Sequence, residues 1–214
     1  MIEAAPVPAA LATADPETPP VGPTEAVVAV VEEPAAAGNN TGVASHKLVT
    51  PGTMLANRLF IPSLGIYAPL EWRGMEAGTY RGQTTSKLDL PADPRRLTLY
   101  NKGGQPCGAP QQGTVLISGH VSSYGTHGAL WSLARLPAGA VAYVSCQNAA
   151  GETQVAAWKQ TQTLLVDKLE LPADLMTNTG PYRLVVVTCA GEIGPDGHYK
   201  SNLIRLFTPV SAVA

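Results

Sequence analysis

Two residues in the sequence have the side chains and the setting for nucleophilic chemistry, Cys189 and His120. Cys189 ends the apolar run of LVVVTCAG (184–191), which predicts a short buried β-strand with the thiol at its C-terminal end. His120 ends a second apolar run, TVLISGH (114–120), in the same way. A thiol at the end of a rigid strand stays reachable, and an imidazole beside it can transfer protons. The two residues therefore predict acyl transfer through a cysteine.

Each residue also has a simpler structural interpretation. Free cysteine is among the most buried residue types, so Cys189 alone fits a core position equally well. A single histidine such as His120 is more often structural, and the other three, His46, His127 and His198, belong to polar linkers or loops. Two such residues at strand ends in one small domain favour a functional pair.

Arg205 is a third candidate, because it interrupts the apolar run LIRLF (203–207). An arginine in such a strand must face solvent or find a buried partner, since burying an unpaired charge is costly. The alternative to a functional role is an outward-facing arginine on an edge strand.

The sequence contains three cysteines, Cys107, Cys146 and Cys189, so at least one thiol stays free or pairs outside the chain. Whether Cys107 and Cys146 form a disulfide is left open by the sequence. No pair of cysteines has the spacing of zinc ligands, and we expect neither a metal site nor a cofactor.

The pattern of apolar runs predicts about eight short strands punctuated by turn residues, with almost no helix. This pattern is typical of an all-β sandwich or a closed barrel. The expected strands are two within 58–72, then 87–91, 114–118, 140–146, one or two within 152–165, 184–188 and 203–208. Short helical turns are expected within 129–136 and near 171–175, and no phosphate-binding glycine loop, HExxH or GxSxG motif occurs.

The composition divides the chain into a tail and one domain. Residues 1 to 50 are rich in Pro, Ala and acidic residues and predict a disordered tail or spacer, whereas residues 51 to 214 predict a single folded domain. The domain is weakly basic without a basic cluster, which argues against a nucleic-acid partner. No apolar run approaches the roughly 20 residues that span a bilayer, and no basic signal-peptide start is present.

Several of these runs, in their order, resemble the sortases, the cysteine transpeptidases of Gram-positive cell surfaces. They are IPSLGIYAPLEW (61–72), GTVLISGH (113–120), LVVVTCAG (184–191) and a C-terminal strand that contains an arginine. Leu90-Pro91 and GHYKSN (197–202) are most similar to the actinobacterial class F branch.

The resemblance implies a closed eight-stranded β-barrel and a role for five residues. Cys189 would attack an LPXTG-like C-terminal sorting signal after its Thr and form a thioacyl enzyme, with His120 as general acid and base. An arginine would stabilise the oxyanion and hold the substrate. Arg205 is the first choice, and Lys200, which follows the Tyr of GHY, is the second. Thr188 would help to shape the substrate site.

The implied partners are proteins that carry the sorting signal and an amine acceptor, such as a lipid-linked peptidoglycan precursor or a pilin lysine. The implied location is extracytoplasmic, at the cell surface, with a membrane anchor that this sequence does not show. One alternative is a catalytically inactive sortase-like scaffold or binding module. Another is a different Cys/His cell-wall enzyme, such as a hydrolase or an L,D-transpeptidase-like enzyme. Those enzymes usually keep the two residues in one SHGC-like stretch, whereas Cys189 lies 69 residues after His120.

Overall fold

The computed structural model describes residues 49–80, 82–169 and 171–210. The tail predicted for residues 1 to 50 lies outside the described residues except for its last two. Strands dominate, and in these three ranges no helix is long and apolar enough to cross a membrane. The elements in order are η1 (Pro51–Thr53), β1 (Arg58–Ile61), η2 (Pro62–Leu64), β2 (Ile66–Arg73), β3 (Met75–Tyr80), β4 (Gln83–Leu88), β5 (Leu97–Tyr100), β6 (Thr114–Ser118), β7 (Ser122–Ser123), β8 (Thr126–His127), η3 (Leu133–Arg135), β9 (Val141–Gln147), β10 (Thr153–Asp167), η4 (Ala173–Met176), β11 (Arg183–Ile193) and β12 (Tyr199–Pro209).

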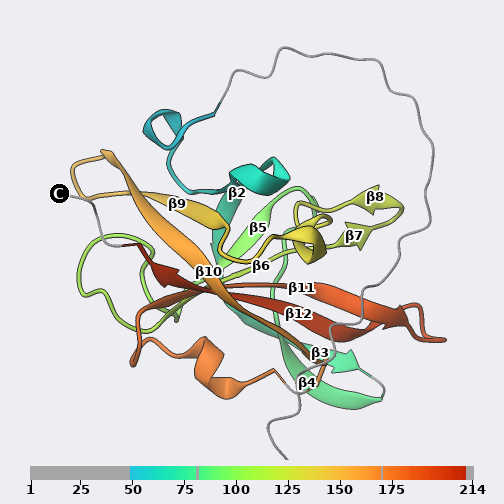
Figure 1. The fold of residues 1–214 in the computed structure, drawn as a ribbon. Coiled ribbons are helices and arrows are strands. Elements are labelled where there is room, and N and C mark those ends of the chain that lie inside the picture. The colour runs from blue at the N-terminus through green and yellow to red at the C-terminus, as the bar shows by residue number, and fades with distance from the viewer. Residues whose placement is uncertain (1–48, 81, 170, 211–214) are drawn as a thin grey trace, which may run out of the picture. The chain divides into compact units, whose positions relative to one another are not determined.

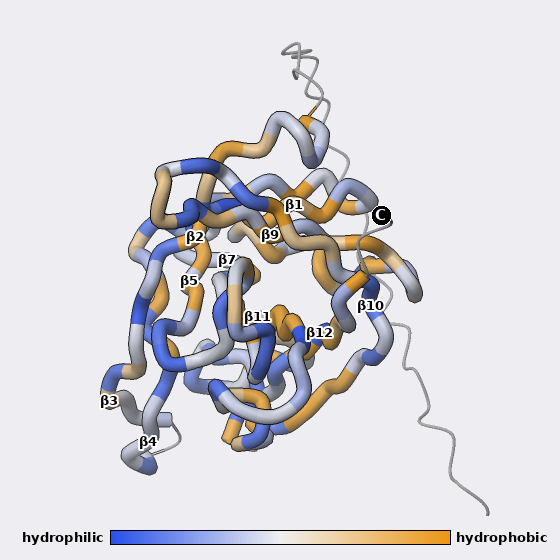
Figure 2. The backbone as a smooth tube through the Cα atoms, turned by 90° about the vertical axis from the view of Figure 1, so that its left-hand side faces the viewer, coloured by the Kyte–Doolittle hydropathy of each residue, from blue (hydrophilic) through white to orange (hydrophobic). Residues whose placement is uncertain are grey.

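Eight of the strands close into one barrel in the order β1-β2-β5-β6-β11-β12-β10-β9. Figure 2 shows these strands arranged in a ring, with the β3–β4 hairpin outside it. The all-β class and the closed eight-stranded barrel predicted from the sequence are therefore confirmed. Two neighbouring pairs are parallel, β2 with β5 and β6 with β11. Parallel pairing matters for the site, because β6 and β11 end at the same rim of the barrel.

The barrel interior is filled by apolar side chains from all eight strands, among them Leu59, Ile117 and Phe207. Successive side chains of β11 point alternately into and out of the barrel, and Leu184 and Val186, two residues apart, both belong to this interior cluster. Burial of such side chains is the main stabilising term, at about 25 cal/mol for each Å² of apolar surface removed from water.

A second apolar cluster lies on the opposite face of β6, β11 and β12. It includes Leu116, Val185, Val187 and Ile204, and Leu175 of η4 packs against it. We call this face of the three strands the outer face. Because these strands are buried on both sides, their sequences are continuous apolar runs without alternation.

The region before β5 differs from the prediction. The strand expected at 87–91 is instead the second arm of a hairpin, in which β3 and β4 pair from Met75 with Leu88 to Tyr80 with Gln83. The turn uses Gly82 at a φ of +76°, which glycine adopts without steric cost. These arms are rich in Thr, Ser and Gly, so they lack the apolar alternation that identifies strands in a sequence. The expected helical turns are the short η3 and η4.

Cys107 and Cys146 form a disulfide, with their Cα atoms 6.2 Å apart. The bridge answers the question that the sequence left open. It joins the polar loop between β5 and β6 to strand β9 and leaves Cys189 as the free cysteine of the described residues.

Removing this disulfide is expected to lower the free energy of unfolding by about 2–4 kcal/mol, because the bridge closes a long loop in the unfolded chain. The two cysteines are 39 residues apart in the sequence. Urea unfolding of the Cys107→Ala/Cys146→Ala variant, beside the oxidised parent, measures the change. An unchanged midpoint would contradict the stabilising role.

Candidate active site

His120 follows the end of β6, whereas Cys189 lies within β11, which continues to Ile193 and so runs past the strand end predicted at the thiol. The register pairs Val187 with Ser118, and the Gly119 N–H donates to the Val187 carbonyl at 3.3 Å. β6 ends at Ser118, and the same register continued by two residues would pair His120 with Cys189. Adjacent strands lie about 4.8 Å apart, so the two side chains start from neighbouring backbone positions.

Both side chains belong to the outer face. Val187 belongs to the outer cluster and Ala190 packs against the interior one, so alternation puts the Cys189 thiol on the outer face, where it is partly exposed. Leu116 of β6 belongs to the outer cluster too, and the same period of two extends from it to His120. The face that carries Leu116 and Val187 is therefore the floor of the candidate site.

The backbone around His120 is tightly held. The Leu130 N–H donates to the His120 carbonyl at 3.3 Å, and Gly128 packs directly against the same peptide unit. Thr188, expected to shape the substrate site, is buried, and its hydroxyl donates to the Gly119 carbonyl at 2.9 Å. Thr188 thus ties the middle of β11 to the residue before His120, and its side chain is buried.

Burial lowers the pKa of His120 below its usual value of 6.5. A hydrogen bond to the backbone of Pro91 acts in the opposite direction, and the positive charge of Lys87 lowers the pKa further. Proline has no N–H, so the imidazole is the donor and the Pro91 carbonyl the acceptor. His120 is consequently neutral at pH 7 in the free protein, which is the form that accepts a proton.

The lowered pKa of His120 predicts a pH-dependent stability. The folded state binds this proton less readily than the unfolded state. The resulting stabilisation is present above the unfolded pKa of about 6.5 and is lost as the pH falls through the folded pKa. Urea unfolding at pH 7.5 and pH 5 should show the parent losing more stability than His120→Gln. Equal losses in the two proteins would contradict the prediction.

Strand β12 carries two basic residues, and the structure puts them on opposite faces. Arg205 lies between Leu203 and Phe207, which both belong to the interior cluster, and is 7% exposed. Its guanidinium donates to the carbonyls of Leu133 and Ala134 in η3, at 3.1 and 2.6 Å, and to the Thr163 hydroxyl. The structure therefore does not bring Arg205 to the thiol. In this position it satisfies the carbonyls of a short helix.

Lys200 and Asn202 are separated by even numbers of residues from Ile204, which belongs to the outer cluster. They therefore lie on the outer face, as Cys189 does, and Arg205 lies on the other face. Asn202 is the direct register partner of Cys189. The Lys200 ammonium lies 2.8 Å from a carboxylate oxygen of Glu192, and this hydrogen bond holds the pKa of Glu192 below its usual range. Of the two basic residues on β12, Lys200 is the one on the side of the thiol.

The sequence did not identify Asn202 as a site residue. The pairing of β11 with β12 is irregular between Ala190 and Ile193, so counting from Cys189 does not reveal its partner. One signal in the sequence bears on the face of Arg205. The period of two in LIRLF puts Arg205 on the same face of the strand as Leu203 and Phe207. All the neighbours of Arg205 in that run are apolar, so the signal does not tell which face is the interior.

The β3–β4 hairpin forms one wall of the site. Lys87 on β4 is close enough to His120 to lower its pKa. At the other end of the hairpin, the Tyr80 hydroxyl donates to the Tyr199 carbonyl at 3.2 Å, and the Lys168 ammonium lies 5.0 Å from the centre of the Tyr80 ring. The hairpin thus runs from the His120 side to the β12 side of the thiol. In Figure 1 it lies below the right-hand ends of β11 and β12, and the β7–β8 hairpin lies above them.

No model of a known protein family matches the sequence, and no curated protein matches it either. The fold, however, matches solved sortases. Sortase C1 of Streptococcus agalactiae aligns with a TM-score of 0.51 and 19% identity over 72% of this chain and 66% of that one. Sortase C1 of Streptococcus suis aligns with a TM-score of 0.52 and 13% identity over 74% of each chain. A lid mutant of sortase A of Corynebacterium diphtheriae aligns with a TM-score of 0.51 and 14% identity over 72% of this chain and 69% of that one.

These likenesses establish that the chain has the sortase fold, as the sequence resemblance predicted. The matched structures named above are sortases of types C and A. The class F assignment therefore remains a prediction.

Proposed function

We propose that this chain is a sortase-type cysteine transpeptidase that cleaves an LPXTG-like C-terminal sorting signal after its Thr and joins the new acyl end to an amine. The observation that supports the proposal is the parallel pairing of β6 with β11 in a barrel of the sortase fold, because both strands run toward the same rim and His120 and Cys189 follow their last paired residues. A covalent thioacyl enzyme divides one difficult amide exchange into two easier acyl transfers.

The neutral imidazole of His120 takes the proton of the Cys189 thiol as its sulfur attacks the Thr carbonyl carbon. The C–N bond of the Thr–Gly peptide then breaks, and His120 gives this proton to the departing amine. In the second half the incoming amine attacks the thioester, His120 accepts the amine proton, and the C–S bond breaks. The proton returns to sulfur, so the enzyme ends in its starting state.

Lys200 supplies the positive charge of the site. Its position on the outer face, two residues from the partner of Cys189, supports this assignment over Arg205, which bonds to η3 from the other face. The scissile carbonyl oxygen of the peptide, which becomes negative in the tetrahedral intermediate, would compete with Glu192 for the ammonium. A Lys ammonium offers charge without the planar donor fork of Arg, so this stabilisation is less directional.

Lys200→Ala is expected to lower kcat/KM for a sorting-signal peptide about 10- to 100-fold with an unchanged Tm, because an exposed ammonium contributes little to folding. Lys200→Arg should retain activity. Arg205→Met should instead lower Tm, since it leaves the η3 carbonyls without donors. If Arg205→Lys lost activity at an unchanged Tm while Lys200→Ala did not, Arg205 would be the functional residue.

The acceptor is an amine of a cell-wall precursor or a pilin lysine, and the protein acts outside the cytoplasm in the manner of a class F enzyme. The disulfide between Cys107 and Cys146 supports this location, since disulfides persist in oxidising compartments and are rare in the cytosol.

A second candidate function is an inactive sortase-like scaffold that binds a partner without catalysis. The observation in its favour is that β12 presents a lysine, and no arginine, on the face of the thiol. A scaffold needs no oxyanion stabilisation and would tolerate this change.

Transpeptidation distinguishes the two candidates. The protein is incubated with LPXTG-type peptides and an oligoglycine or lysine-containing acceptor, and the ligated peptide is detected by mass spectrometry. The enzyme forms a ligated product that requires Cys189. A folded protein that gives neither hydrolysis nor ligation with any motif variant would support the scaffold.

A further inference from the structure

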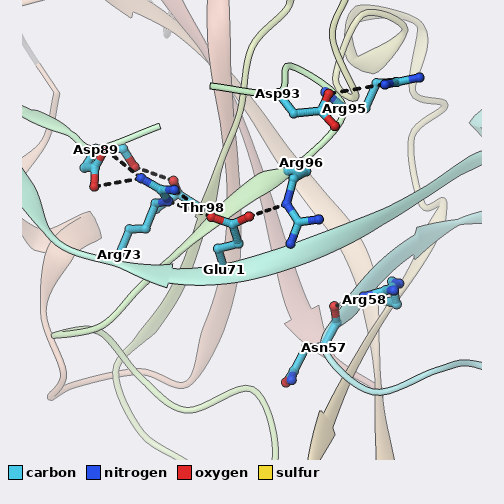
Figure 3. A network of polar contacts seen from close by, with 9 residues as sticks. All are labelled: Asn57, Arg58, Glu71, Arg73, Asp89, Asp93, Arg95, Arg96 and Thr98. Atoms are coloured by element: carbon cyan, nitrogen blue, oxygen red, sulfur yellow. Dashed lines mark hydrogen bonds and ion pairs between the residues drawn. The ribbon is translucent and has the colours of Figure 1, made fainter. Parts of the chain in front are cut away.

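A polar network on the outside of the barrel joins Glu71 and Arg73 of β2 to Asp89, which follows β4 (Figure 3). Arg73, the last residue of β2, bonds to two carboxylates: Glu71, at 2.7 and 2.9 Å, and Asp89, at 3.0 Å to each oxygen. Arg96 contacts the other oxygen of Glu71. The two guanidiniums hold the pKa of Glu71 below its usual range.

Every polar group of Asp89 is engaged. Its carboxylate bonds to Arg73, its N–H donates to the Gly74 carbonyl at 3.1 Å, and its carbonyl accepts the buried Thr98 hydroxyl. Thr98 in turn pairs in register with Ser118, two residues before His120. Asp89 therefore fixes the point where the chain leaves the β3–β4 hairpin.

The segment after Asp89 reaches His120 twice. The buried Pro91 accepts the hydrogen bond of the imidazole through its carbonyl. The Pro94 carbonyl accepts the Ala129 N–H at 2.8 Å, and the next N–H, that of Leu130, donates to the His120 carbonyl. The 89–94 segment thus contacts the imidazole ring through Pro91. It reaches the backbone of His120 through Ala129 and Leu130.

We propose that Arg73 and Asp89 are positioning residues for His120: their ion pair fixes the 89–94 segment, and that segment sets the orientation and the tautomer of the imidazole through the Pro91 carbonyl. An exposed ion pair alone contributes little to stability. The ion pair acts here through geometry, because a ring nitrogen that donates to the Pro91 carbonyl leaves the other nitrogen free to accept a proton. The kinetic part of this inference rests on the proposed transpeptidase function, and the positioning part does not.

The test compares two aspartates of the same segment. Asp89→Ala removes the ion pair between Arg73 and Asp89, which we call the clamp. Asp93→Ala removes an exposed pair with Arg95 that contacts neither Pro91 nor His120. NMR titration of the His120 ring follows each protein, with circular dichroism as the check of folding. Lys87 and its partner Glu76, 3.0 Å apart, are the charges to leave untouched, since Lys87 acts on His120 directly.

In Asp89→Ala the ring resonance of His120 should move, and its midpoint should fall further below 6.5 as the hydrogen bond to Pro91 loosens. Asp93→Ala should leave both unchanged. For an active enzyme, kcat should fall about tenfold at an unchanged KM, and Asp89→Glu should restore part of it. If Asp89→Ala does not fold, Asp89→Asn, which preserves shape and backbone bonds, takes its place.

A folded Asp89 variant with the parental His120 resonance and midpoint would overturn the proposal. This result needs no substrate, so it is separate from a failure of the transpeptidase assignment. If the parent shows no turnover but Asp89→Ala changes the His120 titration as expected, the proposed activity is wrong and the positioning role of Arg73 and Asp89 stands.

Discussion

Cys189→Ala is expected to abolish turnover of a sorting-signal peptide, by roughly 10⁴-fold or more, and to leave the barrel folded. In the proposed mechanism the Cys189 sulfur forms the acyl bond, which an alanine cannot do. The fold should survive because Cys189 is partly exposed and loses a single sulfur, and its neighbours Val185 and Val187 keep the outer cluster packed. Peptide cleavage by chromatography, together with Tm, measures both effects.

The matched control is the Cys107→Ala/Cys146→Ala variant. It should lose stability and keep turnover at a temperature where it is folded, since neither cysteine lies on the outer face beside His120. Equal turnover in Cys189→Ala and the parent would show that the activity, if present, uses another nucleophile.

Gly128→Ala is expected to cost about 100-fold in kcat, because a displacement of a catalytic group by about 1 Å has effects of this size. A methyl group at Gly128 would lie 2.6 Å from the carbonyl carbon of His120, 3.0 Å from its Cβ and closer still to its carbonyl oxygen. The obstacle is mainly backbone, so relief requires His120 itself to move. Overpacking of this kind also lowers the free energy of unfolding by about 1–3 kcal/mol.

Gly52→Ala is the control, since a methyl group there meets no atom within 4 Å. It should change neither kcat nor Tm. Single-turnover acylation should be slowed in Gly128→Ala at an unchanged KM. A Gly128→Ala enzyme with parental kcat would contradict the position that the structure gives to His120.

The strand pattern of the sequence predicted an all-β sandwich or barrel, and the resemblance to sortases implied the closed barrel. The strongest strand signals were TVLIS and LVVVT, which are the cores of β6 and β11. Cys189 and His120 were identified for the same reason: each follows an apolar run that tertiary burial explains, although β11 continues past Cys189 to Ile193. That β6 and β11 are adjacent and parallel is a matter of topology, which no local pattern specifies.

The basic residue was harder to assign, because its face depends on the register of β12. One residue of shift moves every side chain to the other face. The irregular pairing between Ala190 and Ile193 breaks the count from Cys189, so the sequence favoured Arg205 with Lys200 as the second choice, whereas the structure puts Lys200 on the face of the thiol. The ion pair between Arg73 and Asp89 could not be predicted from the sequence either, because it depends on the β3–β4 hairpin. The Thr- and Ser-rich arms of this hairpin lack the apolar pattern of a strand.

The central claim is that Cys189 becomes acylated by a sorting-signal peptide. Intact mass after incubation with an LPXTG-type peptide, without an amine acceptor, tests it most directly, because the thioacyl enzyme then has only water to react with. The bridge between Cys107 and Cys146 leaves Cys189 as the thiol available in the described chain. We expect one adduct with the mass of the peptide up to its Thr, mapped to the fragment with Cys189. A folded protein whose mass stays unchanged with every motif variant would contradict it.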